Sequence, residues 1–237
     1  MNKNFLRSIV MTAALSAGFV GTAAADQMWD FGSLFSNSQQ NTSLGGSYTF
    51  TQGSNWVKAT AVVPMWTAST CDGSAAQPCL FAKYTSGDPN ESGLGLTPAP
   101  QNEINYPDGI ALQSAANNPI LSISLGSVQS TESWAVAGCS SMFMSCTTID
   151  SGVGAGTATE GSVKLSDLGS YGSYIVYVPC ATGAKCDGSM TGGSNNILVV
   201  SATTSVPEPG ALALFGAGLL GCALFVGRRR RSAALRS

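Results

Sequence analysis

The chain has 237 residues, contains no histidine, and has a formal net charge of −2. The lack of histidine excludes Ser-His-Asp and Cys-His catalysis, and it excludes metal sites that need histidine ligands. Residues 26–206 carry twelve acidic side chains against four lysines and no arginine, which excludes nucleic-acid binding because phosphates must be neutralised by cationic side chains.

Residues 1–25 have the pattern of a secretory signal peptide. Lys3 and Arg7 precede an apolar run from Ile9 to Val20, and three alanines then lead to Asp26. This order of charge, apolar core and small residues is typical of export by Sec. We therefore expect signal peptidase to cut between Ala25 and Asp26.

Residues 26–200 predict an all-β ectodomain with a sandwich-like or jelly-roll-like fold. Period-two alternation is clearest from Trp56 to Trp66, where residues 57, 59, 61, 63 and 65 form one apolar face. Further strands are expected around Tyr48–Phe50, Leu121–Leu125, Glu132–Gly138, Tyr174–Val178 and Ile197–Val200. Turn-forming Gly, Asn, Asp and Pro residues separate them. No helical period alternates with these strands, which argues against a parallel sheet.

Six cysteines fall in the ectodomain as three close pairs: Cys71 and Cys79, Cys139 and Cys146, Cys180 and Cys186. An even number in an exported chain predicts disulfides. Six cysteines allow 15 connectivities, so the sequence leaves the pairing open. Short separations favour the three local bridges, because small loops close at low entropic cost.

Trp56 and Trp66 lie on the face of their predicted strand opposite the apolar one. Exposed aromatic rings on a β-sandwich can stack on sugars, so a carbohydrate-binding module is one alternative for the function. The alternative is that a second sheet covers both rings.

Asp88, Asn90 and Ser92 match the first half of a calcium loop, with glycine at its sixth position. The twelfth position is Ala99, where such a loop needs a bidentate glutamate. The pattern therefore leaves a structural Ca²⁺ site and an ordinary turn as alternatives, and no other cofactor is expected.

The acidic residues lie in no recognisable catalytic motif. A glycosidase needs only two carboxyl groups at a suitable separation, so a secreted hydrolase with paired carboxylates remains an alternative. The leading prediction is a protein without enzymatic activity.

Residues 201–206 are expected to form a short polar linker to the C-terminal segment, residues 207–232. There Val206-Pro207-Glu208-Pro209 precedes the apolar run 210–227, whose length suits a transmembrane helix. A basic tail follows, consisting of Arg228, Arg229, Arg230 and Arg231. Arginines at this position stop translocation and keep the end of the chain in the cytoplasm.

This arrangement closely resembles the PEP-CTERM sorting signal. The resemblance implies that exosortase, a membrane enzyme thought to cut at the motif, is a partner. The Gly93-Leu94-Gly95-Leu96 and Asn102-Glu103-Ile104 segments also resemble a stretch that recurs in exosortase-dependent surface proteins.

Together these features predict a protein exported by Sec and anchored in the inner membrane until exosortase processes it. We then expect it at the cell surface or in the extracellular matrix, associated with exopolysaccharide.

Overall fold

The computed structural model describes residues 25–35, 39–116, 118–129, 132–141, 143–154, 161–179 and 196–206. All of them except Ala25 belong to one unit, which extends from Asp26 to Val206. Residues 1–24 of the predicted signal peptide and the predicted transmembrane helix lie outside the described residues, whereas Ala25 is the first residue of a strand. None of the helices within the described ranges has the length and apolar character needed to span a bilayer.

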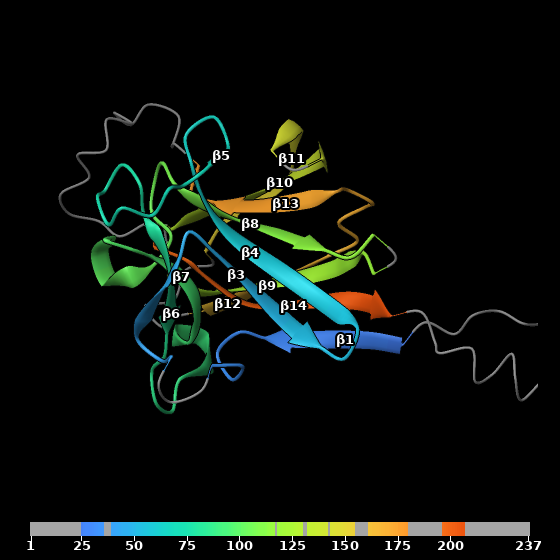
Figure 1. Ribbon diagram of the computed structural model, residues 1–237, viewed down its shortest axis with the longest axis horizontal. Helices are drawn as coiled ribbons and strands as arrows, with labels where there is room; N and C mark the ends of the chain where they lie inside the picture. The colour runs from blue at the N-terminus through green and yellow to red at the C-terminus, as the bar shows by residue number, and fades with distance from the viewer. Residues whose placement is uncertain are drawn as a thin grey trace, which may run out of the picture. The chain divides into compact units, whose positions relative to one another are not determined.

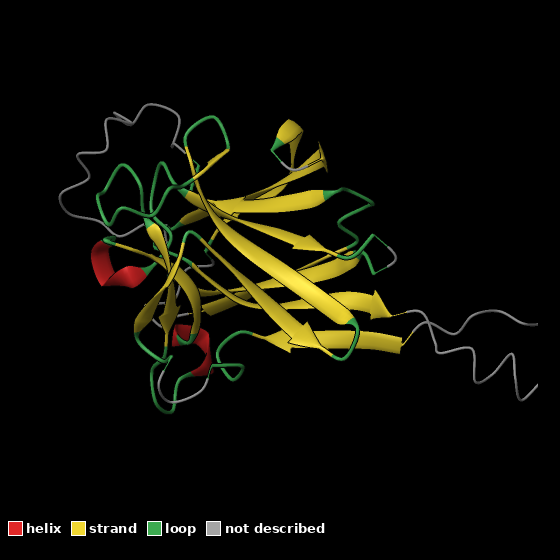
Figure 2. Cartoon of the chain, viewed as in Figure 1, coloured by secondary structure: helices red, strands yellow, loops and turns green. Residues whose placement is uncertain are grey.

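The described residues form two antiparallel β-sheets, which confirms the predicted all-β fold (Figures 1 and 2). Sheet A has the strand order β12 (Gly161–Ser166), β9 (Ile120–Val128), β14 (Leu198–Val206), β7 (Gly93–Thr97), β6 (Cys79–Lys83) and β2 (Thr42–Gly45), and β1 (Ala25–Asp30) also pairs with β14. Sheet B has the order β11 (Met144–Val153), β10 (Ser133–Ser141), β13 (Ser173–Tyr177), β8 (Gly109–Ser114), β4 (Asn55–Val63) and β3 (Ser47–Gln52), and β5 (Thr67–Ala68) pairs with β4. Two short 3-10 turns, η1 (Pro89–Glu91) and η2 (Pro100–Asn102), flank β7.

The main core lies between the inner faces of the two sheets. Alternate residues of β4 face it, as the period-two pattern predicted, and Val57, Ala59 and Ala61 are fully buried there. Trp29 of β1, Phe31 directly after β1, and Tyr174 of β13 join the same cluster. Burial of these apolar side chains is the main favourable contribution to folding.

Strand β4 ends at Val63, so the prediction of a strand reaching Trp66 was wrong. Met65 and Trp66 have φ values of 64° and 55°, in the left-handed region that breaks an extended strand. Met65 is therefore not on the apolar face, and its side chain is 89% exposed.

The prediction that residues 201–206 form a linker was also wrong, because these residues form the second half of β14. Ala202 and Thr204 are buried, and β14 pairs with β9 from Leu198 to Thr204. The alternation of small and polar residues in this stretch matches a strand inside a sheet as well as it matches a linker. The ectodomain thus continues to Val206.

Candidate functional site

The described ectodomain ends where the sorting sequence starts. Val206 is the last residue of β14 and the first of the four residues Val206-Pro207-Glu208-Pro209. The backbone N–H of Ser205 donates to the carbonyl of Pro119 at 3.0 Å, so the strand is held in place almost to its end. Pro207 has no N–H to donate, and such a residue cannot continue a central strand. The rest of the motif, and the four arginines, lie outside the described residues.

Two of the predicted local disulfides are present. Cys71 is bonded to Cys79, and Cys139 is bonded to Cys146. The first closes the loop between β5 and β6, and the second joins the neighbouring strands β10 and β11. Both bridges therefore close short loops. The third pair, Cys180 and Cys186, lies outside the described residues.

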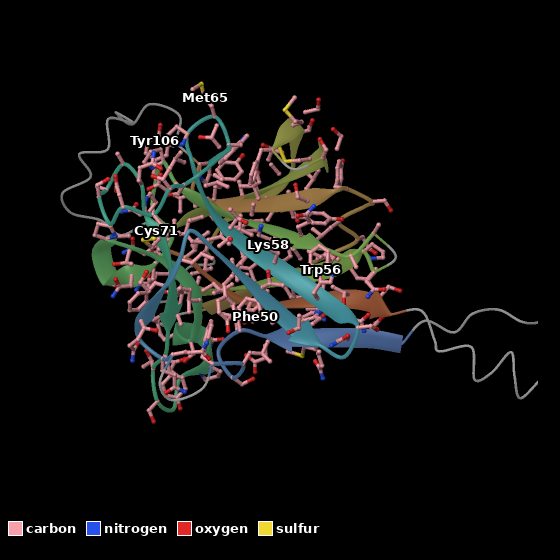
Figure 3. All side chains as sticks on the ribbon, viewed as in Figure 1. Phe50, Trp56, Lys58, Met65, Cys71 and Tyr106 are labelled. Atoms are coloured by element: carbon pink, nitrogen blue, oxygen red, sulfur yellow. A yellow bond between two sulfur atoms is a disulfide. The ribbon has the colours of Figure 1, made fainter. Side chains whose placement is uncertain are left out.

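Trp56 and Trp66 both lie on the outer side of sheet B, and both are half-buried. Trp56 is on β4, near the end of the strand opposite Met65 (Figure 3). The ring of Trp66 packs edge-on against Tyr177, with centroids 4.7 Å apart. Phe143 also packs on the small apolar cluster that Trp66 covers. Trp66 is therefore a packing residue in large part, which leaves Trp56 as the candidate for a ligand contact.

Asp88, Asn90 and Ser92 form a capped turn. The Asp88 carboxylate accepts from the N–H of Asn90 at 3.0 Å and so caps η1. The Ser92 hydroxyl donates to the carbonyls of Thr85 and Asp88 and accepts from the Thr85 N–H. Local backbone bonds thus account for the turn without an ion. Within the described ranges, no group of three or more acidic or cysteine side chains has a geometry that would hold a metal.

A buried cluster of charged residues was missed by the sequence analysis. Lys83 of β6 donates to Glu91 of η1 at 2.5 Å and to Glu103, which follows η2. Glu103 is fully buried and Glu91 nearly so. One oxygen of each carboxylate, Oε1 of Glu91 and Oε2 of Glu103, has no hydrogen-bond partner. No spacing pattern relates positions 83, 91 and 103, so the sequence contains no signal for this cluster.

The surroundings in this cluster shift the pKa values of Glu103 and Lys83. Burial raises the pKa of the Glu103 carboxyl to about 7, although the bond from Lys83 opposes this rise. Burial alone would lower the pKa of the Lys83 ammonium, but its bonds to Glu103 and Glu91 outweigh burial and raise that pKa. Glu91 and Glu103 are close enough to share one lysine, but they are withdrawn from solvent. The two carboxylates therefore connect η1 and the residues after η2 to β6 through Lys83. This structural role suits their burial better than catalysis on a glycan does.

The Glu103 segment belongs to the Gly-Leu-Gly-Leu and Asn-Glu-Ile stretches noted in the sequence. Gly95 of β7 lies directly under the backbone of residues 102 and 103, and a Cβ at Gly95 would overlap the carbonyl oxygen of Asn102. Ile104 then forms a bridge with Ile197, beside β14. These residues therefore pack the η2 segment on sheet A.

A groove of about 620 Å³ crosses the outer face of sheet A. Its floor is a row of three hydroxyl side chains from adjacent strands, because Ser122 of β9 pairs with Ser166 of β12 and with Thr203 of β14. Lys164 and Asp167 line its rim. None of the three hydroxyls is bonded to another described residue.

Asp26 of β1 also lines this groove, together with Leu121. The register between β9 and β14 shifts at this point, because Ser122 pairs with Thr203 whereas Ile120 pairs with Thr204. The shift turns Ile120 into the core and leaves Leu121 37% exposed.

A second groove of about 330 Å³ lies on the outer side of sheet B. Lys58 and Thr60 of β4 line it together with Ser47, Ser69 and Phe143. Like the first groove, it combines hydroxyl groups, one lysine and apolar contact area.

Comparison with known proteins gives one match. A family model described as the PEP-CTERM protein-sorting motif matches residues 205–231. No curated protein and no solved structure matches the chain. The matched range begins at the end of β14 and covers the apolar run and the four arginines. The chain thus carries a PEP-CTERM protein-sorting motif, which implies exosortase as its processing partner and an extracellular or cell-surface destination.

Proposed function

We propose that this protein is a non-enzymatic surface or matrix protein that associates with exopolysaccharide. It would be exported by Sec, held in the inner membrane by residues 210–227, and released when exosortase acts. The position of the sorting motif is the observation that carries the proposal. Because β14 ends at Val206 and the motif matches from residue 205, cleavage after β14 leaves every described strand intact.

The groove on sheet A supports the association with polysaccharide. Its floor of hydroxyl groups from Ser122, Ser166 and Thr203 offers donors and acceptors at the spacing of neighbouring strands, about 4.8 Å. A sugar polymer presents the same kind of groups.

Retention of the exported protein by the matrix tests this proposal. Ser122→Val and Thr203→Val, made together, should release the protein from a polysaccharide fraction that retains the unchanged protein. Thr147→Val, at an exposed position of β11, is the matched control. Full retention of the double variant would contradict the assignment of the groove. Intact mass should also show a chain that begins at Asp26 and lacks residues 210–237.

A carbohydrate-binding module that uses Trp56 is the second candidate, since this ring is only half-buried. Trp56→Ala would then weaken retention more than the groove variants do, with little change in melting temperature.

The hydrolase alternative concerns Asp26 and Asp167, which line the same groove. Both side chains are exposed to solvent. Release of reducing ends by the unchanged protein, and its loss in Asp167→Asn, would favour hydrolysis.

A further inference from the structure

The start of β1 and the end of β14 lie side by side in the ectodomain. The Phe31 N–H donates to the Val200 carbonyl at 2.9 Å, and the Trp29 indole N–H donates to the Thr204 hydroxyl at 3.1 Å. As the residue number rises in β1 it falls in β14, so the strands are antiparallel. Continuing this register places Ala25 and Asp26 beside Ser205 and Val206. In Figure 1 the start of β1 and the end of β14 are adjacent.

Neighbouring loops complete an edge at this end of the sandwich. We define the terminal edge by Asp26, Gln27, Gln52, Asn55, Asn118 and Ser205. Gln27 donates to Gln52 at 2.6 Å, Asn55 donates to Gln27 at 2.8 Å, and Asn118 donates to Asn55. This chain of amides ties β1 of sheet A to the β3–β4 turn of sheet B. The edge is therefore held together by side-chain hydrogen bonds, and both the first and the last strand of the ectodomain terminate at it.

Three residues separate this edge from the apolar run. Val206 ends β14 and the run begins at Gly210, so residues 207–209 are the whole spacer. Fully extended, three residues span about 10 Å. A folded ectodomain tethered so closely cannot rotate freely above a bilayer, because a surface far from Val206 could not reach the lipid headgroups.

Charge favours the same orientation. Residues 26–206 have a formal net charge of −8, and anionic lipid headgroups repel such a domain. Of the twelve acidic residues, Asp26 belongs to the terminal edge, and Asp167 lies beside it in the groove on sheet A. Asp108 and Glu132 directly precede β8 and β10, at the ends of those strands remote from the edge. Lys83, Glu91 and Glu103 lie away from the edge as well.

We propose that the terminal edge is the membrane-facing surface of the ectodomain before processing, and that lipid headgroups are its partner. This inference rests on the proposed anchoring by residues 210–227. The groove on sheet A reaches the same edge through Asp26, so one end of it faces the bilayer until the tag is cut.

Quenching by spin-labelled lipid tests the orientation. The full chain is placed in phosphatidylcholine vesicles that contain headgroup nitroxides, with a fluorophore at Ser54→Cys or at Met65→Cys and Cys222→Ser in both. Ser54 is exposed in the β3–β4 turn, and Met65 is exposed beyond the other end of β4. The nine residues of β4 span about 30 Å, far beyond contact with headgroups. We expect the label at residue 54 to lose most of its fluorescence and the label at 65 to keep it.

Equal quenching at the two positions, or stronger quenching at residue 65, would overturn the proposal. A variant with twelve Gly and Ser residues inserted between Val206 and Pro207 tests the tether. Such a linker has an end-to-end distance of roughly 20 Å, so the difference between the two labels should shrink. An unchanged difference would refute the argument from spacer length. Failure of the full chain to float with the vesicles would instead contradict the proposed membrane anchoring.

Discussion

Replacing Glu103 by glutamine should change how stability depends on pH. The pKa of Glu103 is raised from 4.5 to about 7 in the folded protein, chiefly by burial. A carboxyl with a raised folded pKa stabilises the fold most below its unfolded value, and that contribution is lost as pH rises through the folded value. The free energy of unfolding should therefore fall between about pH 4.5 and pH 7. The shift corresponds to about 3 kcal/mol at most.

Glu103→Gln removes this titration while its amide oxygen can still accept from Lys83. Urea unfolding of the released protein, with disulfides oxidised, measures the effect across pH 4.5–8. We expect the unchanged protein to lose more stability than Glu103→Gln as pH rises. Burial also raises the pKa of Asp108 to about 6, so Asp108→Asn should remove a further decline with pH. Asp150→Asn, at an exposed position of β11, is the control. Parallel curves for the unchanged protein and Glu103→Gln would refute the reasoning.

Three other predictions concern Gly95, Trp66 and the third pair of cysteines. Gly95→Ala should lower the free energy of unfolding by about 2 kcal/mol or more, because the added Cβ meets the backbone of Asn102; chemical denaturation measures this. Trp66→Ala should lower the melting temperature by several degrees, since the ring covers an apolar cluster, and an unchanged value would show that it is a free surface ring. Non-reducing peptide mapping should join Cys180 to Cys186, and a crossed pair would contradict the local pattern of the two observed bridges.

Several strands could be predicted from the sequence because their residues alternate strictly. The inward face of β4 is apolar at every second position, and Val57, Ala59 and Ala61 are buried as expected. A period of two follows from the geometry of an extended chain and needs no knowledge of neighbouring strands. The end of β4 could not be predicted in this way, because it depends on the left-handed conformations of Met65 and Trp66.

Strand β14 shows why local pattern alone fails in a central strand. Residues 201–206 are small and polar, which suits a linker, yet Ser201 and Thr204 are buried. Their side chains are accommodated because β9 lies on one side of the strand, and β7 and β1 lie on the other. Those partners are distant in the sequence, so the burial of this segment is a property of the assembled sheet.

The candidate sites likewise fall into those that a local pattern predicts and those that depend on the assembled sheets. The sorting motif is contiguous, and its prolines, apolar run and arginines each act through their own chemistry, so residues 205–231 could be recognised without a fold. The two local disulfides were predictable because loop closure depends mainly on separation along the chain. The groove on sheet A and the Lys83 cluster required the register of several strands, and neither could be predicted.

By itself, therefore, the sequence determined the sorting motif, the all-β class and the close cysteine pairs. These features depend on neighbouring residues, whose chemistry or periodicity is readable along the chain. Only the tertiary structure decided that Lys83 joins Glu91 to Glu103, that a hydroxyl row crosses sheet A, and that β1 returns beside β14. Such contacts form because burial of apolar faces brings together strands that are far apart in the sequence, and their partners are chosen by packing and register rather than by local pattern.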